Sequence, residues 1–142
     1  MISVSAVATD TIGQTSTDAN SVTVDNIADP TMHAGDLDAN TSTGRGGKWN
    51  ATVTITVYDD GEAPVAGATV NGSWSDGASG SGSCTTNASG QCTITKNDIS
   101  RNSSSATFTV TSVTHASLTY AVDANHDPDG DSDGTAIVIA KP

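Results

Sequence analysis

The sequence predicts an all-β fold, an antiparallel β-sandwich of about seven short strands. Thr, Ser, Gly, Asn and Asp dominate the composition, whereas Leu and the helix-favouring Glu and Lys are scarce. Residues of this kind are typical of strands and turns. Short segments of alternating apolar and polar residues recur along the chain, separated by turn residues about every 8–12 positions. Aromatic residues are few, so the core must consist mainly of Val, Ile and Ala.

The main domain is expected to span residues 31–142, and its clearest strand covers residues 49–57. Apolar residues stand at every second position from Trp49 onwards, so one face of this strand is apolar. Trp49 and Trp74 both fall on the apolar faces of their strands, which predicts that both are buried. Residues 31–48 are rich in Ser, Thr and Gly and predict an irregular segment. The other expected strands cover residues 65–74, 83–86, 90–95, 106–111, 117–122 and 136–140.

Residues 1–30 predict an N-terminal β-hairpin, because residues 2–9 and 21–26 alternate and a polar turn separates them. This hairpin is either the tail of a preceding repeat or an addition that packs against the main domain. Met1 is followed at once by strand-like alternation and not by the apolar stretch of a signal peptide. We therefore expect Met1 to be an introduced start on a fragment of a longer protein. No apolar run approaches the roughly 20 residues that span a bilayer, which predicts no membrane insertion.

The chain is strongly acidic, with 16 Asp and Glu against 5 Lys and Arg and a formal net charge of −11. Nucleic-acid binding depends on Lys and Arg that neutralise phosphates, so this balance argues against a nucleic-acid partner. It argues equally against binding to anionic membrane surfaces.

Residues 123–134, Asp-Ala-Asn-His-Asp-Pro-Asp-Gly-Asp-Ser-Asp-Gly, contain five aspartates and neither Lys nor Arg. Two bare carboxylates about 5 Å apart repel by about 3 kcal/mol at an effective dielectric constant of 20. Such a loop therefore needs a cation or must spread its charges into water.

The pattern D-x-D-x-D-G over residues 129–134 is typical of the start of an EF-hand calcium loop. The twelfth position counted from Asp129 is Ala140 instead of Glu, and the following residues alternate like a strand. The sequence therefore predicts a calcium loop between two strands. Calcium is preferred because the donors are hard oxygens and no His/Cys cluster of the zinc type is evident. Asp36 and Asp38 can complete the shell if the two segments meet, or else face solvent. The candidate ligands are Asp127, Asp129, Asp131, Asp133, Asp36, Asp38 and Asp123.

Cys84 and Cys92 flank a turn-rich segment between two β-like runs. If the two side chains face each other across a hairpin, they form a disulfide, which favours an oxidising compartment. The alternative is a pair of buried thiols in a cytosolic protein. With the acidic loop, the pair favours a secreted or cell-surface location.

Three segments, ATVTITVYDDGEAPVAGATVNGSWS, CTTNASGQCTITK and SATFTVTSVTHASLTY, give residues 49–122 a resemblance to bacterial Ig-like domains of the invasin and intimin type. The segment VSAVATDTIGQTSTDANSVTVDN is similar to the two closing strands of such a repeat. The resemblance implies an Ig-like antiparallel β-sandwich, of the kind found in modules of secreted and surface proteins. The chain also resembles, more weakly, non-catalytic C-terminal modules of secreted bacterial hydrolases, including subtilisin-like proteases. It departs from the family in its cysteine pair, its Asp/Gly-rich insertion before Trp49 and its acidic loop.

No G-x-S-x-G, H-E-x-x-H or Walker pattern is present, and the three histidines are far apart in sequence, which predicts a non-enzyme. We expect a calcium-stabilised module of a larger secreted or cell-surface bacterial protein, acting as a spacer, adhesion or stabilising domain. Its partners would be other domains of the same parent protein or a surface protein. The alternative is a carbohydrate-binding module for an extracellular polysaccharide, with Tyr58 and Tyr120 as glycan contacts.

Overall fold

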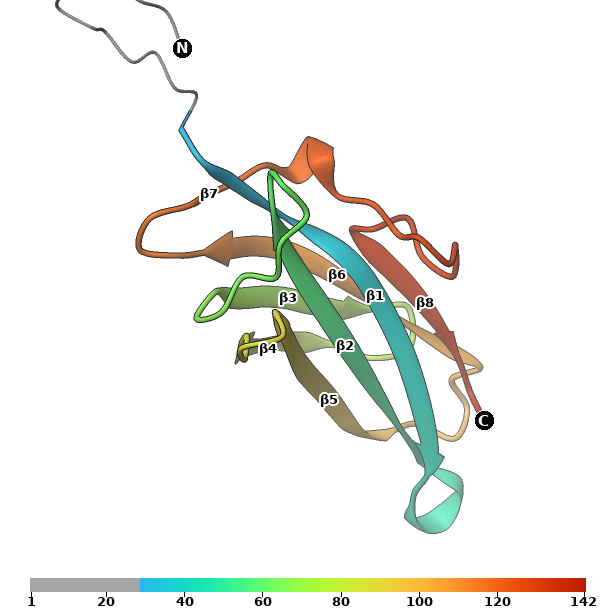
Figure 1. The fold of residues 1–142 in the computed structure, drawn as a ribbon. Coiled ribbons are helices and arrows are strands. Elements are labelled where there is room, and N and C mark those ends of the chain that lie inside the picture. Colours follow the sequence, from blue (N-terminus) through green and yellow to red (C-terminus); the bar gives the residue numbers. More distant parts are fainter. Residues whose placement is uncertain (1–28) are drawn as a thin grey trace, which may run out of the picture.

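A computed structural model describes residues 29–142, which form two sheets of four strands each, packed face to face (Figure 1). The predicted all-β sandwich is thereby confirmed, whereas the hairpin expected over residues 1–30 lies almost wholly outside the described residues. The strands are β1 (Thr31–Thr43), β2 (Trp49–Asp59), β3 (Thr69–Ser75), β4 (Gly80–Thr85), β5 (Gln91–Ile99), β6 (Ser105–Thr114), β7 (Thr119–Tyr120) and β8 (Ala136–Ala140).

One sheet has the strand order β5-β2-β1-β7 and the other the order β4-β3-β6-β8. Neighbouring strands are antiparallel except β1 and β7, which pair in parallel over two residues. The first, second and fifth strands share one sheet while the third and sixth share the other, as in an Ig-like sandwich. The helical segments of residues 29–142 are the 3-10 turns η1 (Arg45–Gly47) and η2 (Val122–Ala124). Neither has the length and apolarity of a helix that crosses a membrane.

Strand β1 occupies the segment for which the sequence predicted irregular structure, so that prediction was wrong. β1 pairs with β2 in antiparallel register from Met32 opposite Asp59 to Thr43 opposite Trp49. A β-bulge between Ala34 and Asp36 shifts the register by one residue. The bulge changes the face on which the buried residues lie, so the sequence loses the strict period of two that indicates a strand.

Smaller differences concern the ends of other strands. β3 begins only at Thr69, because Gly67 adopts a positive φ of 75° in a turn before it. β4 begins at Gly80, inside the glycine-rich segment that was expected to be a connection. β7 has two residues, where six had been expected to be extended.

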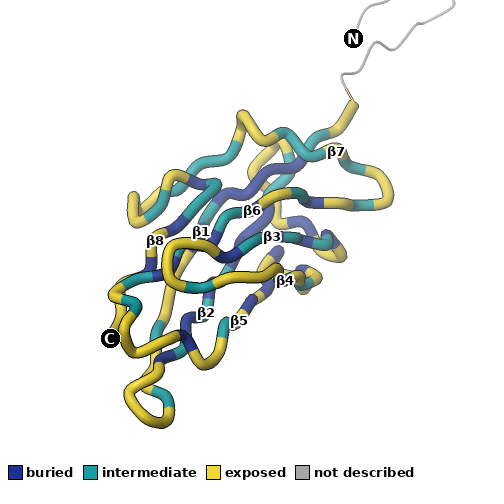
Figure 2. Tube along the Cα trace, turned by 180° about the vertical axis from the view of Figure 1, so that it is seen from behind, coloured by how far each residue is buried: buried dark blue, intermediate teal, exposed yellow. Residues whose placement is uncertain are grey.

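The core lies between the two sheets, and buried residues alternate with less buried ones along β3, β6 and most of β2 (Figure 2). Trp49 is fully buried, and its indole Nε1 lies 3.2 Å from the carbonyl oxygens of both Ser100 and Ser103, to which it donates. Trp74 is also buried, and its ring centroid lies 5.0 Å from that of Phe108. The predicted burial of both tryptophans is confirmed.

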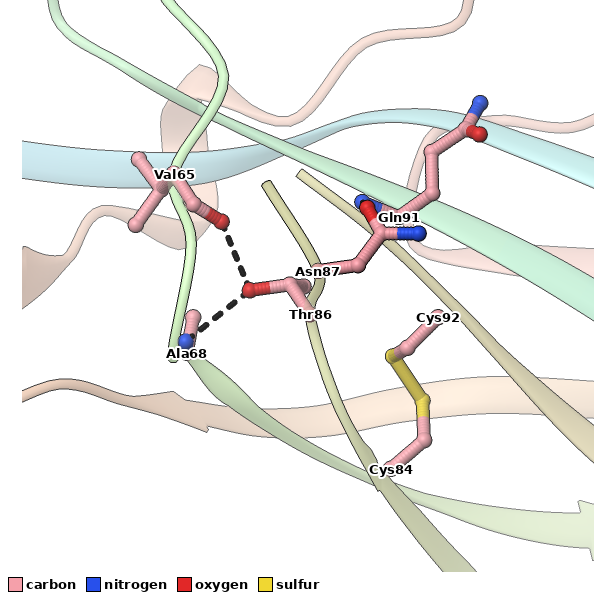
Figure 3. Close-up of a disulfide and its surroundings, with 7 residues drawn as sticks. All are labelled: Val65, Ala68, Cys84, Thr86, Asn87, Gln91 and Cys92. Atoms are coloured by element: carbon pink, nitrogen blue, oxygen red, sulfur yellow. Dashed lines mark hydrogen bonds between the residues drawn. A yellow bond between two sulfur atoms is a disulfide. The ribbon is translucent and has the colours of Figure 1, made fainter. Parts of the chain in front are cut away.

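Cys84 and Cys92 form a disulfide, with their Cα atoms 5.7 Å apart (Figure 3). The expected hairpin is wrong, however, because Cys84 lies on β4 and Cys92 on β5, which are the edge strands of different sheets. The bond therefore joins the two sheets, and closing so short a loop contributes about 2–3 kcal/mol on the chain-entropy description.

The turn between these strands is held by Thr86, whose hydroxyl is buried (Figure 3). This hydroxyl donates to the carbonyl of Val65 over 2.6 Å and accepts the N–H of Ala68 over 2.9 Å. The turn is thereby fixed to the segment that leads into β3.

Candidate metal centre

The acidic loop, residues 125–135, runs from η2 to β8 and lies beside the first half of β1 (Figure 1). Two backbone groups of Ala34 hold it there. The N–H of Ala34 donates to Oδ1 of Asn125 over 2.9 Å, and the carbonyl of Ala34 accepts the N–H of His126 over 3.1 Å. The amide nitrogen of Asn125 donates to the hydroxyls of Tyr120 (2.6 Å) and Thr135 (3.0 Å). One asparagine thus fixes both ends of the loop against β1.

The end of the loop requires a glycine at position 134. Gly134 has a positive φ of 82°, and a Cβ atom there would lie 2.6 Å from the backbone nitrogen of His126. Next to it, Oδ1 of Asp133 accepts the N–H groups of Thr135 (2.9 Å) and Ala136 (2.6 Å) at the start of β8. The loop therefore closes on itself through backbone contacts.

The structure brings five of the predicted ligands together, two from β1 and three from the loop. We call them the acidic cluster: Asp36, Asp38, Asp127, Asp129 and Asp131. One carboxylate oxygen from each of Asp36, Asp38 and Asp129 lies within 4.8 Å of the others. The same holds for Asp127, Asp129 and Asp131, so Asp129 belongs to both groups.

Two buried oxygens in the acidic cluster have no hydrogen-bond partner, namely Oδ1 of Asp36 and Oδ1 of Asp127. The other oxygen of Asp127 accepts the N–H of Ser132 over 2.5 Å. Leaving a buried acceptor unpaired is costly, more so when it is charged. Within residues 29–142 the ion pairs are those of Glu62 with two histidines, and none involves the acidic cluster. A cation bound among these carboxylates would supply a partner for such an oxygen.

The pKa values in the acidic cluster record this crowding. Burial raises the pKa of Asp36 to about 6, followed in effect by the negative charge of Asp38, a hydrogen bond between the Asp36 and Asp127 carboxyl groups, and the charges of Asp127 and Asp129. Burial also raises the pKa of Asp127, but hydrogen bonds, chiefly from Ser132, outweigh it and lower the pKa to about 2. A cation among these side chains would offset the repulsion between them.

The raised pKa of Asp36 predicts how the stability of the metal-free protein depends on pH. Because Asp36 holds its proton up to about pH 6 in the folded chain but loses it near 3.8 when unfolded, stability falls as the pH rises through this window. Asp127 acts in the opposite sense, and its contribution is lost as the pH falls from 3.8 towards about 2. In EDTA, we expect the melting temperature of the wild type to fall between about pH 4 and pH 6. The Asp36→Asn variant should show a clearly smaller fall, to which the raised pKa of Asp131 still contributes; an equal fall in both proteins would contradict the assignment.

Two predicted ligands lie outside the acidic cluster. Asp123 lies in η2, is exposed, and belongs to none of the close groups of ligand atoms found among residues 29–142. Asp133 instead binds backbone N–H groups, and those of Ala136 and Thr135 lower its pKa. The alternating D-x-D-x-D pattern gives no sign of this difference, because it depends on the turn into β8, where Asp133 meets its backbone partners.

The acidic cluster fits calcium in the type and number of its donors. Calcium takes six to eight hard oxygens, and its carboxylate ligands bind through one or both oxygens. Five carboxylates from two segments can supply that number with backbone carbonyls or water. The donors are all oxygen, so they favour calcium or magnesium over zinc or copper.

A second group of ligand atoms, which the sequence did not predict, lies next to the acidic cluster. It consists of His33 on β1, Glu62 in the turn after β2 and His126 in the acidic loop. The ring centroids of the two histidines are 4.9 Å apart. His33 and His126 are far apart in sequence, and the fold brings them together. We call these three residues the histidine group.

The two tyrosines predicted to contact a glycan are both partly covered. The ring of Tyr58 lies over Gly35, where a Cβ atom would overlap it. The hydroxyl of Tyr120 is held by Asn125, and burial raises the pKa of Tyr120 despite this hydrogen bond. Carbohydrate binding remains a prediction from the sequence.

Comparisons of the chain with protein-family models, with curated proteins and with solved structures find no match. The class of protein is therefore defined by the fold alone, an all-β sandwich with a disulfide between its sheets. The resemblance to invasin-type and intimin-type domains stays a prediction.

Proposed function

We propose that this chain is a non-catalytic, calcium-stabilised Ig-like module of a larger secreted or cell-surface bacterial protein. It acts as a spacer, adhesion or stabilising domain beside other domains of its parent. The observation that carries the proposal is the convergence of five aspartates from β1 and the acidic loop, with two buried oxygens left unpaired.

The location of the acidic cluster supports a structural role for the cation. Asp36 and Asp38 belong to β1 of one sheet, whereas the loop that carries the other three aspartates leads directly into β8 of the other sheet. A cation among them ties β8 and its loop to β1. Without the cation, the mutual repulsion of the carboxylates pushes the loop away from the sheet.

The disulfide supports the proposed location. Disulfides persist in oxidising compartments and are rare in the cytosol. Extracellular calcium is also abundant enough to fill sites of modest affinity, whose Kd values in extracellular modules reach about 10⁻⁴–10⁻³ M. Both features suit a module outside the cell.

Thermal unfolding with and without calcium tests the proposal. At a free calcium concentration 100 times Kd, binding to the folded state alone adds about 2.7 kcal/mol. For a domain of this size that corresponds to a rise in melting temperature of about 10 °C. We expect this rise in calcium chloride, its reversal by EDTA, and a much smaller response to sodium chloride of equal ionic strength. A melting temperature that calcium and EDTA leave unchanged would remove the cation from the account.

A further inference from the structure

We propose that the histidine group, His33, Glu62 and His126, binds a divalent transition-metal ion, with Zn²⁺ as the representative. This site is separate from the acidic cluster and differs from it in chemistry. Its three ligands come from β1, from the turn between β2 and β3, and from the acidic loop, which meet at one end of the sandwich (Figure 1).

The spacing of the ligand atoms suits a single small ion. Nε2 of His33 lies 3.1 Å from Oε1 of Glu62, and Nε2 of His126 lies 3.3 Å from Oε2 of the same carboxylate. Two atoms that each bind a tetrahedral zinc ion at about 2.05 Å are about 3.3 Å apart. The observed separations are of this size, and they are also those of a direct ion pair, each histidine facing a different oxygen of Glu62. One ligand atom from each of the three residues lies within 4.8 Å of the others.

The strongest support for a metal ion at the histidine group is the buried, unpaired imidazole of His33. Its side chain is 3% exposed and neither ring nitrogen has a hydrogen-bond partner, although Nε2 lies 3.1 Å from Oε1 of Glu62. Buried polar groups are nearly always paired in folded proteins, so a buried imidazole without a partner needs an explanation. A metal ion bound through a ring nitrogen provides one.

His126 is oriented for the same task. Its Nδ1 lies 3.1 Å from the carbonyl oxygen of Ala124, and since a carbonyl only accepts, Nδ1 carries the proton. In the neutral ring Nε2 then keeps its lone pair, and it is this atom that faces Glu62. A backbone carbonyl that fixes the tautomer in this way is the usual support of a metal-binding histidine.

Glu62 is held in place by an unusual backbone conformation. It has a positive φ of 62°, a region that residues with a side chain rarely adopt. Asp59 maintains the turn: its carbonyl accepts the N–H of Glu62 over 3.1 Å, and its Oδ1 accepts those of Gly61 and Ala63, each over 2.9 Å. Backbone strain of this kind is concentrated at binding sites.

Two imidazole nitrogens and one carboxylate form a ligand set for zinc and its neighbours, whereas calcium prefers oxygen alone. Three protein ligands also leave one position of a tetrahedral ion for water or an external group. The competing account is a pair of His–Glu ion pairs without any metal, which predicts no specific zinc affinity.

Calorimetric titration of the full chain with zinc chloride, in calcium sufficient to fill the acidic cluster, tests the proposal. We expect one zinc ion per chain, with binding at least about 10-fold weaker in His126→Ala and in Glu62→Gln. His115→Ala is the matched control and should bind as the wild type does, since His115 lies outside the histidine group, with Nε2 3.2 Å from the carbonyl of Ala66. Cobalt(II) should give the visible absorption of a tetrahedral site in the wild type and lose it in Glu62→Gln.

Either of two outcomes would overturn the proposal: no zinc binding, or equal binding by the wild type and Glu62→Gln. The side chain of Glu62 is 57% exposed, so Glu62→Gln should fold even if a histidine variant does not. A chain that binds zinc but shows no calcium-dependent melting would refute the proposed function alone, and the reverse result would refute only the zinc site.

Discussion

Replacing Asp129 with asparagine should weaken calcium binding by about 100-fold and abolish most of the calcium-dependent rise in melting temperature. Asp129 belongs to both groups of carboxylates in the acidic cluster, the one with Asp36 and Asp38 and the one with Asp127 and Asp131. Asparagine keeps the shape and one oxygen but removes the charge. The same loss of charge relieves repulsion in the calcium-free protein, so the variant should be at least as stable as the wild type in EDTA.

Calorimetric titration with calcium, followed by thermal melts in calcium and in EDTA, measures both effects. Asp123→Asn provides the matched control, because it removes an equal charge from the same part of the chain at a side chain outside the acidic cluster. It should retain calcium affinity within a few-fold of the wild type. If both variants lost affinity equally, the effect would come from net charge and not from a defined site.

Replacing Gly134 with alanine should destabilise the protein by about 2–5 kcal/mol and weaken calcium binding. A left-handed backbone costs an alanine about 1–2 kcal/mol, and displacing a packed neighbour adds about 1–3 kcal/mol. The neighbour here is the backbone of His126, whose nitrogen and Cα would lie 2.6 and 2.8 Å from the new Cβ. Moving that backbone also moves Asp127 beside it and the imidazole of the histidine group.

Gly130→Ala separates strain from displacement. Gly130 has nearly the same φ, 79° against 82° for Gly134, but a Cβ atom there would meet nothing within 4 Å. Urea unfolding should therefore give a loss of about 1–2 kcal/mol for Gly130→Ala and a clearly larger one for Gly134→Ala. Equal losses would mean that the contact between Gly134 and His126 does not hold the loop.

The sequence predicted the parts of the fold in which a local pattern survives. Trp49 to Val57 alternate strictly, and all their apolar members are buried as expected. β1 was not predicted because a bulge between Ala34 and Asp36 interrupts the alternation of buried and exposed residues. The cysteine spacing predicted the disulfide but not the strands that it joins. A short connection is equally compatible with a hairpin and with a step from one sheet to the other.

The candidate site also has a part that the sequence predicts and a part that only the fold brings together. The acidic loop is contiguous in sequence, so its aspartates could be recognised from their spacing alone. That Asp36 and Asp38 join them depends on the pairing of the loop with Ala34, which no local pattern encodes. The histidine group joins residues 33, 62 and 126, and only the three-dimensional structure brings these together. The one signal that the sequence held was a histidine between two apolar residues, Met32 and Ala34.

The positions of the disulfide and the acidic cluster mean that the two flanks of the sandwich are fastened by unlike chemistry. β5 and β4 are outermost in their sheets on one flank, and a covalent bond holds them together. On the opposite flank the loop into β8 lies against β1, held by hydrogen bonds and, in our proposal, by a cation bound to its aspartates. A reductant and a chelator therefore act on opposite flanks of the domain. A force that pulls the sheets apart would be resisted by a covalent bond on one flank and, if the proposed cation is bound, by an ion-dependent contact on the other.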